Sequence, residues 1–499
     1  MEISSEQHRK TQYKDLLKYT GLFGGMQGLN LLSTLVRNKL SALLLGPAGL
    51  GVISLFVSVI TMLNNATNLG ISFSGVRHLS EIAGEADNQR VTAYINVIRF
   101  WGVVTAVAGT VLCVLLAPFL SEWTFDSAQY TTGFRLVSPV VGLTALTGAE
   151  LAILKGVRRL KDVALSTLFA TFLSLFIVIP LYYFYREAAI VPALIIISLL
   201  TFGATACFSF RFYPWCRTLF SRASFRQGGP LIRLGVSFII AGTFGALAEY
   251  LIRMFIVAQG SVADVGFYNT GVVLCVSYMG MVFVAIDNDY FSRLSAIHKE
   301  RERLNELVNQ QIELSVMLIA PLIAGLLVFL PLVIRMLYSD DFLTTIPMVE
   351  WAWLFVFLKG FNLSLAYIAL AKGDSRTFLA IELVCHLIYV AMGFAGFHFA
   401  GLAGIGMAMS GSALCETLIL SGCAYHKYHF RFTGRLLRVV MLYMPFLLFA
   451  FFLTSAGRGW IYWISGTFSV GVCSLLSVYL LNKRTGLLQS LRDRFNLKK

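Results

Sequence analysis

Long apolar segments recur along the whole chain and constrain its fold more than any other feature. A helix of about 20 apolar residues is long enough to cross the hydrocarbon core of a bilayer. Fourteen such segments are present, at 19–45, 48–72, 95–120, 134–154, 163–185, 188–210, 234–258, 266–290, 309–337, 346–371, 377–397, 399–425, 437–455 and 459–482. Only 13% of the 499 residues are charged, and the mean hydropathy is +0.74. The sequence therefore predicts an all-α polytopic membrane protein with about 14 transmembrane helices.

The distribution of basic residues predicts the topology. The formal net charge is +14, and the alternation of loops places 32 of the 40 Lys and Arg residues on one side of the membrane. The opposite side receives only Arg135, Arg186, Arg335 and Arg458. This asymmetry follows the positive-inside rule, so we expect both termini in the cytoplasm. Residues 1–18 then form a cytoplasmic tail rather than a signal peptide, and the basic charge reports topology rather than a nucleic-acid partner.

Three pairs of basic residues recur at nearly constant spacing and indicate an internal repeat. The separations are 216, 216 and 217 residues. The pairs are Arg37 with Arg253, Arg77 with Arg293, and Lys155 with Lys372. Because six segments separate the copies, both copies have the same orientation, as in repeats related by an axis along the membrane normal. We expect two parallel, pseudo-symmetric six-helix bundles and two extra C-terminal helices.

This repeat divides the chain into six parts. The core consists of a first lobe with six helices at 19–213 and a second lobe with six helices at 233–425. The remaining parts are the cytoplasmic tail at 1–18, a cytoplasmic linker at 214–232, the added helix pair at 426–482 and a basic cytoplasmic tail at 483–499.

Two arginines within apolar segments are the first candidates for a binding site. At the rise of a helix, Arg37 lies about 13 Å before Gly46, and Arg253 lies about 10 Å before Gly260. A cation in the hydrocarbon region is costly and normally faces an aqueous cavity. A guanidinium group also binds phosphate oxygens through two hydrogen bonds at once. We therefore expect both arginines in a cationic central cavity; the alternatives are an ion pair with a carboxylate or a side chain that extends to the membrane surface.

Further polar residues complete the predicted substrate site. Asn30 shares a helical face with Arg37, because residues three or four apart lie on one side of a helix. Asn64 and Asn68 are one turn apart in the second segment, and Lys359 is a third cation, in the tenth segment. The two asparagines of the second segment could bind sugar hydroxyls or could join neighbouring helices. The sequence leaves both roles open.

The chain contains no GxxxxGK[ST] motif, so we expect no nucleotide cofactor. The energy would then come from a proton or sodium gradient or from the substrate's own gradient. Glu249 lies one turn before Arg253, where it could exchange a proton or form a permanent ion pair. Glu382 and His386 have the same spacing and form either a second relay or a polar contact between helices. The eight cysteines form no CxxC pair, and we expect no metal site.

A gate is predicted near the cytoplasmic end of the eighth segment. Asp287 and Asp289 lie there. Arg77, after the second segment, and Arg293, at the corresponding place in the second copy, are their candidate partners. An ion pair between these groups could close the cytoplasmic side of a transporter.

Several short motifs resemble one family of membrane transporters. They are the Gly-Leu-Phe-Gly-Gly run at 21–25, the Leu-Gly-Pro-Ala-Gly-Leu-Gly turn at 45–51, and Lys155-Gly156 at the end of the fourth segment. With these motifs the chain, up to about residue 425, resembles the Wzx-type polysaccharide (O-antigen repeat-unit) flippases. These belong to the multidrug/oligosaccharidyl-lipid/polysaccharide (MOP) exporter superfamily, together with MATE-type multidrug exporters and lipid II flippases.

The resemblance implies a specific activity. Such proteins move undecaprenyl-pyrophosphate-linked oligosaccharides for O-antigen, capsule or exopolysaccharide from the cytoplasmic to the outer leaflet of the bacterial inner membrane. They work by alternating access with ion coupling, as monomers beside other polysaccharide-assembly proteins. The last two helices depart from the twelve-helix pattern, and in lipid II flippases an extra pair contributes to a lipid groove.

Two alternatives follow from the same segments. A MATE-like exporter of small molecules would need an acidic and aromatic cavity for cationic drugs, whereas the predicted lining is basic. A membrane polysaccharide polymerase or glycosyltransferase would place catalytic side chains on a large outer loop. The longest outer connection, at about 120–134, carries Glu122 and Asp126 but no convergent set of catalytic residues. We therefore expect a transporter and not an enzyme.

Overall fold

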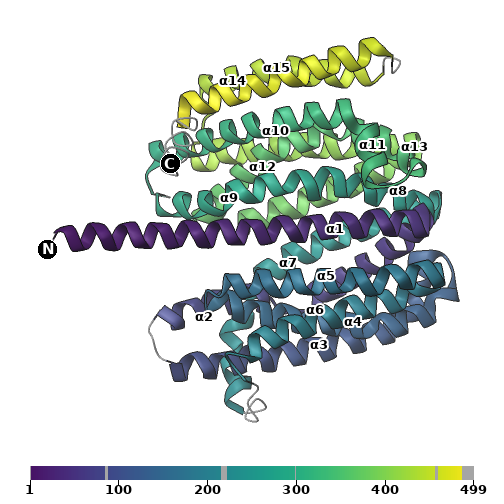
Figure 1. Ribbon diagram of the computed structural model, residues 1–499, viewed down its shortest axis with the longest axis vertical. Helices are drawn as coiled ribbons and strands as arrows, with labels where there is room; N and C mark the ends of the chain where they lie inside the picture. Colours follow the sequence, from purple (N-terminus) through teal and green to yellow (C-terminus); the bar gives the residue numbers. More distant parts are fainter. Residues whose placement is uncertain (1, 85–87, 215–221, 298, 456–458, 486–499) are drawn as a thin grey trace. The chain divides into compact units, whose positions relative to one another are not determined.

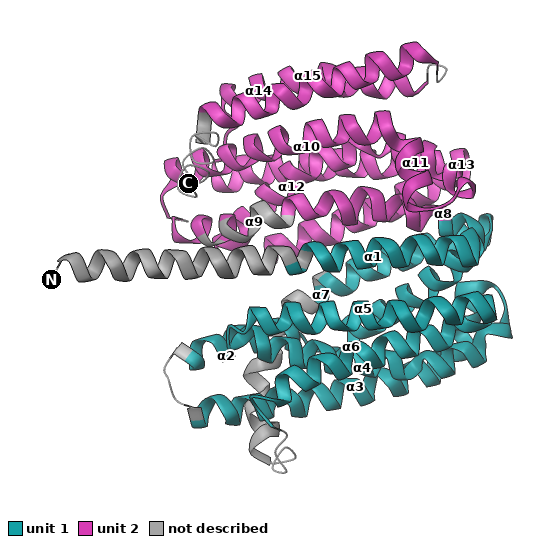
Figure 2. Cartoon of the chain, in the orientation of Figure 1, with its two compact units in different colours: residues 1–266 teal, residues 267–499 magenta. Residues whose placement is uncertain are grey.

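The structure is helical throughout its regular elements. The computed structural model describes the backbone of residues 2–84, 88–214, 222–297, 299–455 and 459–485, with side chains except at 2–25, 27, 84, 88, 222–239, 241, 284–289, 292, 484 and 485. Every regular element in these ranges is a helix, which confirms the all-α prediction. The chain forms two compact units, residues 1–266 and 267–499 (Figure 2).

The helices account for the predicted number of membrane crossings. Ten elements in the described ranges are long and apolar enough to cross a membrane. Three of these, Gly28–Thr67, Leu160–Phe210 and Ser375–Tyr428, have 40, 51 and 54 residues, enough for two crossings each. A further helix, α7 (Arg222–Gln259), covers the segment predicted at 234–258. All fourteen predicted segments thus coincide with helices, and the chain is a polytopic membrane protein.

In its described residues, the first unit contains the helices α1 to α7 and the start of α8 (Figure 1). α3 packs on α4, α4 and α5 pack on α6, and α1 packs on α5 and α7. Most of the buried side chains are apolar, as expected for helices that are hydrophobic on all sides. The elements are α1 (Glu2–Thr67), α2 (Ile71–Gly84), α3 (Asn88–Phe125), η1 (Ala128–Tyr130), α4 (Thr131–Gly156), α5 (Leu160–Tyr185), η2 (Arg186–Ala189), α6 (Ile190–Phe210), α7 (Arg222–Gln259) and α8 (Val262–Val272).

In the second unit, α12 packs on α13, and α10 packs on α12, α14 and α15. One turn of π-helix, η4, links α8 to α9. The elements are η4 (Val273–Tyr278), α9 (Met279–Ala296), α10 (Arg301–Leu337), η5 (Asp340–Thr345), α11 (Ile346–Trp351), α12 (Trp353–Ala371), α13 (Ser375–Tyr428), α14 (Gly434–Thr454) and α15 (Trp460–Thr485). α7 packs against α1 and α3, so it belongs to the first unit, and the boundary between the units lies after Gly266. The division into lobes at 19–213 and 233–425 stays a prediction.

Glycine interrupts α1 and α13 where each divides into two crossings. Gly46 has φ 65° and is followed by Pro47, and Gly401 has φ 56°. A positive φ is easily adopted by glycine and rarely by other residues. The proline also lacks the N–H that a continuous helix would need. The sequence motif at 45–51 is therefore a break between two helices rather than a loop.

The two glycine-containing turns that the repeat relates pack against each other inside the first unit. Gly51 lies against the carbonyl of Val262, and Gly266 lies against the carbonyl of Pro47, so closely that a Cβ atom on either glycine would collide with that carbonyl. Each turn thus places its last glycine on the beginning of the other turn. Reciprocal contacts of this kind are typical of a two-fold relation between repeats.

Candidate substrate and coupling sites

Arg253 is buried and held by three hydrogen bonds. Only 8% of the residue is exposed. Its Nε donates to Ser54 Oγ of α1 at 3.0 Å, and its Nη1 donates to the Glu249 carboxylate at 2.6 Å and to the Glu249 carbonyl at 2.9 Å. A hydrogen bond of 2.9 Å between Tyr250 and Thr124 ties the same turn of α7 to α3. Of the two roles left open for Glu249, this geometry is that of an ion pair.

Arg37 has a different environment. It is half-buried in the first half of α1, and its electrostatic neighbour is the phenol of Tyr182 in α5. Within the described part of the chain, no carboxylate lies within ion-pair distance of this guanidinium. Its charge therefore has no counter-ion from the described residues, although Arg253 has one. A half-buried guanidinium of this kind can bind a phosphate group.

The three predicted asparagines, two in α1 and one directly after it, fall into two classes. Asn30 Oδ1 and Asn64 Oδ1 are buried and have no hydrogen-bond donor among the described residues. Asn68, by contrast, donates to Ser72 Oγ at 3.2 Å across the break between α1 and α2. The neighbouring Asn65, which the sequence analysis did not select, joins α1 to α7 by donating to the Gly242 carbonyl at 3.2 Å. The two acceptors without donors are the ones that a sugar hydroxyl could satisfy.

Lys359 lies in the second unit, half-buried on α12. Its Nζ is 5.9 Å from the centre of the Phe355 ring, a cation–π distance. It also acts electrostatically on Glu382 in the first half of α13. Glu382 and His386 are in contact, with 3.6 Å between Oε2 and Nδ1. The structure thus brings one predicted cation together with the second predicted relay.

The predicted gate residues are only partly described. Arg77, on α2, pairs with Glu81 of the same helix at 3.3 Å, and both side chains are more than half exposed. Arg293 is exposed in the last turn of α9. The side chains of Asp287 and Asp289 lie outside the described residues, so the gate stays a prediction.

One buried ion pair was missed by the sequence analysis. Arg99 of α3 and Glu150 of α4 are 2% and 3% exposed, and they are joined by hydrogen bonds of 2.9 and 3.2 Å. Ser209 of α6 donates to Glu150 at 2.5 Å, and the Arg99 guanidinium lies 4.7 Å from the Phe210 ring centre. Arg99 lies near the beginning of its apolar segment, at 95–120, where a basic residue is expected at the cytoplasmic side. The spacing between residues 99 and 150 gives no local signal.

The last two helices are fixed to α10 by polar contacts. Asn309 of α10, only 2% exposed, accepts a hydrogen bond from Thr433 N at 2.9 Å and donates one to the Arg431 carbonyl at 3.0 Å. At the other end, Tyr462 of α15 donates to the Val328 carbonyl of α10 at 2.9 Å. These bonds hold α14 and α15 beside α10.

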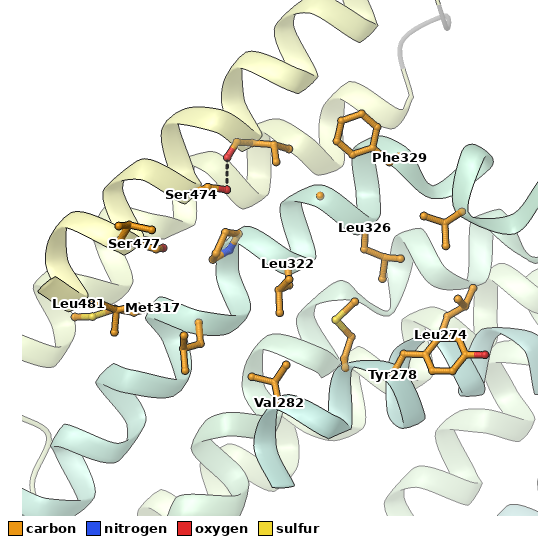
Figure 3. A pocket seen from close by; sticks show the side chains of 17 residues that line it. Leu274, Tyr278, Val282, Met317, Leu322, Leu326, Phe329, Ser474, Ser477 and Leu481 are labelled. Atoms are coloured by element: carbon orange, nitrogen blue, oxygen red, sulfur yellow. Dashed lines mark hydrogen bonds between the residues drawn. The ribbon is translucent and has the colours of Figure 1, made fainter. Parts of the chain in front are cut away.

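An apolar groove of about 740 Å³ lies between α15, α10, η4 and α9 in the second unit (Figure 3). Its two serines are hydrogen-bonded within the protein: Ser474 donates to the Val470 carbonyl at 2.7 Å, and Ser477 forms a hydrogen bond with Tyr443 at 2.8 Å. The lining residues are Leu274, Tyr278, Met279, Val282, Met317, Leu318, Pro321, Leu322, Gly325, Leu326, Phe329, Val333, Val470, Ser474, Ser477, Val478 and Leu481. The groove can accept an extended hydrocarbon chain.

Comparisons with solved structures give the same fold as the resemblance based on the short sequence motifs. Among solved structures, the lipid II flippase MurJ in an inward closed conformation matches with a TM-score of 0.68 and 14% identity, over 93% of this chain and 99% of that chain. An inward-facing MATE family multidrug transporter of the MOP superfamily matches with a TM-score of 0.64 and 15% identity, over 83% and 96%. These likenesses confirm the fold that the resemblance implied.

Sequence comparisons identify the family. The lipid III flippase of Escherichia coli (strain K12) is 25% identical over 363 residues, which make up 70% of this chain and 83% of that protein. A family model described as "Polysaccharide biosynthesis protein" matches residues 41–347, more than half of the chain. The chain therefore belongs to this family of polysaccharide biosynthesis proteins.

Proposed function

We propose that the protein is a flippase that moves polyprenyl-pyrophosphate-linked oligosaccharides across a bacterial inner membrane, from the cytoplasmic to the outer leaflet. The observation that carries the proposal is the environment of Arg37, a half-buried cation with no carboxylate partner in the described part of the chain. Such a site attracts an anion and disfavours a cation. A pyrophosphate group supplies several oxygens for the planar guanidinium fork.

The remaining parts of such a substrate also find suitable partners. The buried Oδ1 atoms of Asn30 and Asn64 lack donors among the described residues, and sugar hydroxyls would supply them. Asn30 is 16 residues before Gly46 and Asn64 is 18 residues after it, so the two asparagines lie at similar distances along α1 from its break. In the second unit, the apolar groove of about 740 Å³ suits the isoprenoid chain. The name of the lipid III flippase, a relative at 25% identity, supports a lipid-linked sugar as the substrate class.

The topology follows from the basic loops. We infer both termini in the cytoplasm, since the positive-inside rule assigns that side to the basic loops. The substrate is then loaded from the cytoplasmic leaflet by a monomer that works beside enzymes of polysaccharide assembly. Glycan transfer itself would belong to those enzymes.

Reconstitution in liposomes tests this function. Protein is placed in liposomes that contain an undecaprenyl-pyrophosphate-linked oligosaccharide, and translocation is measured as the fraction of glycan that an added glycosidase can reach. We expect wild-type protein to raise this fraction with time, Arg37→Ala to slow the rise roughly 10- to 100-fold, and Arg37→Lys to restore it partly because the charge returns without the fork. Lys39→Ala, two residues away and on another helical face, is the matched control. No translocation by wild-type protein, or equal translocation by Arg37→Ala, would contradict the proposal.

A second candidate is export of small cationic molecules. It is favoured by two carboxylates, Glu382 and Glu416, that face a small hollow in the second unit, and by the likeness to MATE transporters. Efflux of a fluorescent cationic dye from the same liposomes separates the two functions. The flippase proposal predicts glycan translocation without dye efflux.

A further inference from the structure

Five carboxylates with described side chains lie well inside the spanning helices, and they divide into two groups. Three of them have an arginine within ion-pair distance, whereas Glu382 and Glu416 have none among the described residues. The three pairs are Glu150 with Arg99, Glu249 with Arg253, and Glu313 with Arg435. A carboxylate already neutralised by arginine is a poor proton carrier, because the cation favours its charged form. Among the carboxylates with described side chains, Glu382 and Glu416 are therefore better suited to carry a proton.

Glu382 and Glu416 face one hollow from neighbouring helical segments. Glu382 is in the first half of α13, about 11 Å from Ser375 at the rise of a helix, and Glu416 is in the second half. Both line a small hollow together with Cys385 and apolar side chains such as Leu420. The space, about 10 Å³, admits about one water molecule. Two carboxylates in such a confined place repel each other when both are charged.

Basic groups complete this cluster. His386 Nδ1 lies 2.7 Å from the Glu382 carbonyl, and because a carbonyl only accepts, Nδ1 is the donor. This leaves Nε2 of the neutral ring able to take up a proton. From α12, Lys359 acts electrostatically on Glu382, as does Glu416 from the second half of α13. Cys385 and Cys415 are the remaining titratable neighbours.

The charges of the cluster do not balance until one proton is added. Two carboxylates and one ammonium give a net charge of −1 while His386 is neutral. A net charge in an apolar bundle is costly, and a proton shared between the carboxylates removes it. A metal ion is a poorer fit, because no group of three or more His, Cys, Asp or Glu side chains in the described part of the chain could hold one.

We propose that Glu382 and Glu416 bind one shared proton, with His386 as the exchanging group, and that uptake and release of this proton drive the transport cycle. In the bound state a carboxyl O–H bond forms at one glutamate and the other carboxylate accepts its hydrogen bond. In release this O–H bond breaks and the proton passes to His386 Nε2 or to water. No oxidant or second substrate is required. The proton site stands on the geometry above, while its coupling to a lipid-linked sugar rests on the proposed function.

Charge displacement after a pH step measures the proton site without any sugar substrate. Full-length protein in liposomes is adsorbed on a solid-supported membrane, and the transient current is recorded as the external pH is stepped between alkaline and acidic values. We expect a transient in wild-type protein and its loss in Glu382→Gln/Glu416→Gln. Lys359→Ala removes a positive charge that opposes protonation, so the midpoint of the transient moves to higher pH. Glu122→Gln and His398→Gln, at exposed positions outside the cluster, should keep the wild-type transient and midpoint.

The outcomes separate the proton site from the substrate. A wild-type transient in the double variant would overturn the site. If the double variant does not yield folded protein by size-exclusion chromatography, each single variant must move the midpoint, and an unchanged midpoint in both would overturn it as well. Glycan translocation driven by a pH gradient in the double variant would refute the coupling and leave the flippase proposal standing. If the double variant lost the transient while wild-type protein failed to translocate glycan, that result would refute the proposed flippase function and support the proton site.

Discussion

The two compact units differ in how the charged side chains within their helices are paired. In the first unit, two buried arginines with described side chains are paired with glutamates, Arg99 with Glu150 and Arg253 with Glu249. In the second unit, a large groove is lined by apolar side chains, and Glu382 and Glu416 lie within the helices without an arginine. On the two proposals made above, the first unit supplies the cation that binds the headgroup. The second unit supplies the apolar groove for the lipid chain and the groups that exchange a proton.

This comparison also separates structural charges from functional ones. A buried ion pair contributes little net stability, but removal of one partner is strongly destabilising because it leaves a buried charge alone. On our proposal, a half-buried cation such as Arg37, which has no carboxylate partner among the described residues, acts on a ligand instead. Burial together with pairing, rather than the mere presence of a charge in an apolar segment, therefore decides what a substitution does.

The largest effect is expected at the buried pair of the first unit. Glu150→Gln leaves Arg99 without a counter-ion at 2% exposure and should destabilise the protein by about 3–5 kcal/mol. Glu313→Gln in the second unit should cost much less, because its partner Arg435 is 60% exposed and remains hydrated. The fraction of monodisperse protein after heating, measured by fluorescence-detected size-exclusion chromatography, checks both. Equal losses in the two variants would remove the distinction between the units.

The two arginines of α1 and α7 should respond differently. Arg37→Ala should lower translocation roughly 10- to 100-fold with normal protein levels, since a hydrogen bond to a charged group contributes about 1.5–3 kcal/mol. Arg253→Ala also removes the partner of Glu249 and Ser54, so it should reduce the amount of folded protein as well. Translocation normalised to folded protein, measured side by side, gives the comparison. If Arg253→Ala folded normally but did not transport, the structural role of Arg253 would be contradicted, and both arginines would be substrate ligands.

The groove of the second unit offers an intermediate test. A Cβ atom at Gly325 would meet only Val470 Cγ1, at 3.9 Å, so Gly325→Leu can extend into the groove without a backbone clash. It should lower translocation about tenfold, because the displacement of about two buried methylene groups of the lipid costs about 1.6 kcal/mol. Gly471→Leu on α15 is the matched control, since nothing lies within 4 Å of a Cβ there. Equal activity of both variants would mean that the groove does not hold lipid during transport.

The smallest effect is expected at the turn between α12 and α13. Hydrogen bonds from Lys427 and Tyr428 hold the pKa of Asp374 well below its usual range. A carboxyl group whose pKa is lowered by folding stabilises the folded state at pH values above its ordinary pKa. This stabilisation is lost as the pH falls towards the lowered pKa. Asp374→Asn should therefore lower stability at neutral pH by about 1 kcal/mol or less, and the difference from wild type should shrink in acid. If the difference in melting temperature between wild type and Asp374→Asn stayed constant from pH 7 to pH 4, a stabilising ion pair at Asp374 would be contradicted.

The fold could be read from the sequence to a large extent, and the site only in part. Apolar segments of membrane length and the glycine turns at residues 46 and 260 are local signals, so the fourteen crossings were predictable. The Arg253–Glu249 contact was also local, one helical turn long. The Arg99–Glu150 pair was not, because it joins two helices whose relative rotation depends on packing. The convergence of Glu382 and Glu416 on one hollow, with Lys359 near Glu382, depends on the packing of three helical segments. The sequence gives no local signal for it either.

The central claim is that Arg37 recognises the pyrophosphate headgroup of a polyprenyl lipid. Native mass spectrometry of the full-length protein with undecaprenyl pyrophosphate measures this directly, with undecaprenol as the uncharged control lipid. We predict that wild-type protein binds the pyrophosphate form in preference to undecaprenol, and that Arg37→Ala binds the two lipids equally. An undiminished preference for the pyrophosphate form in Arg37→Ala would contradict the account.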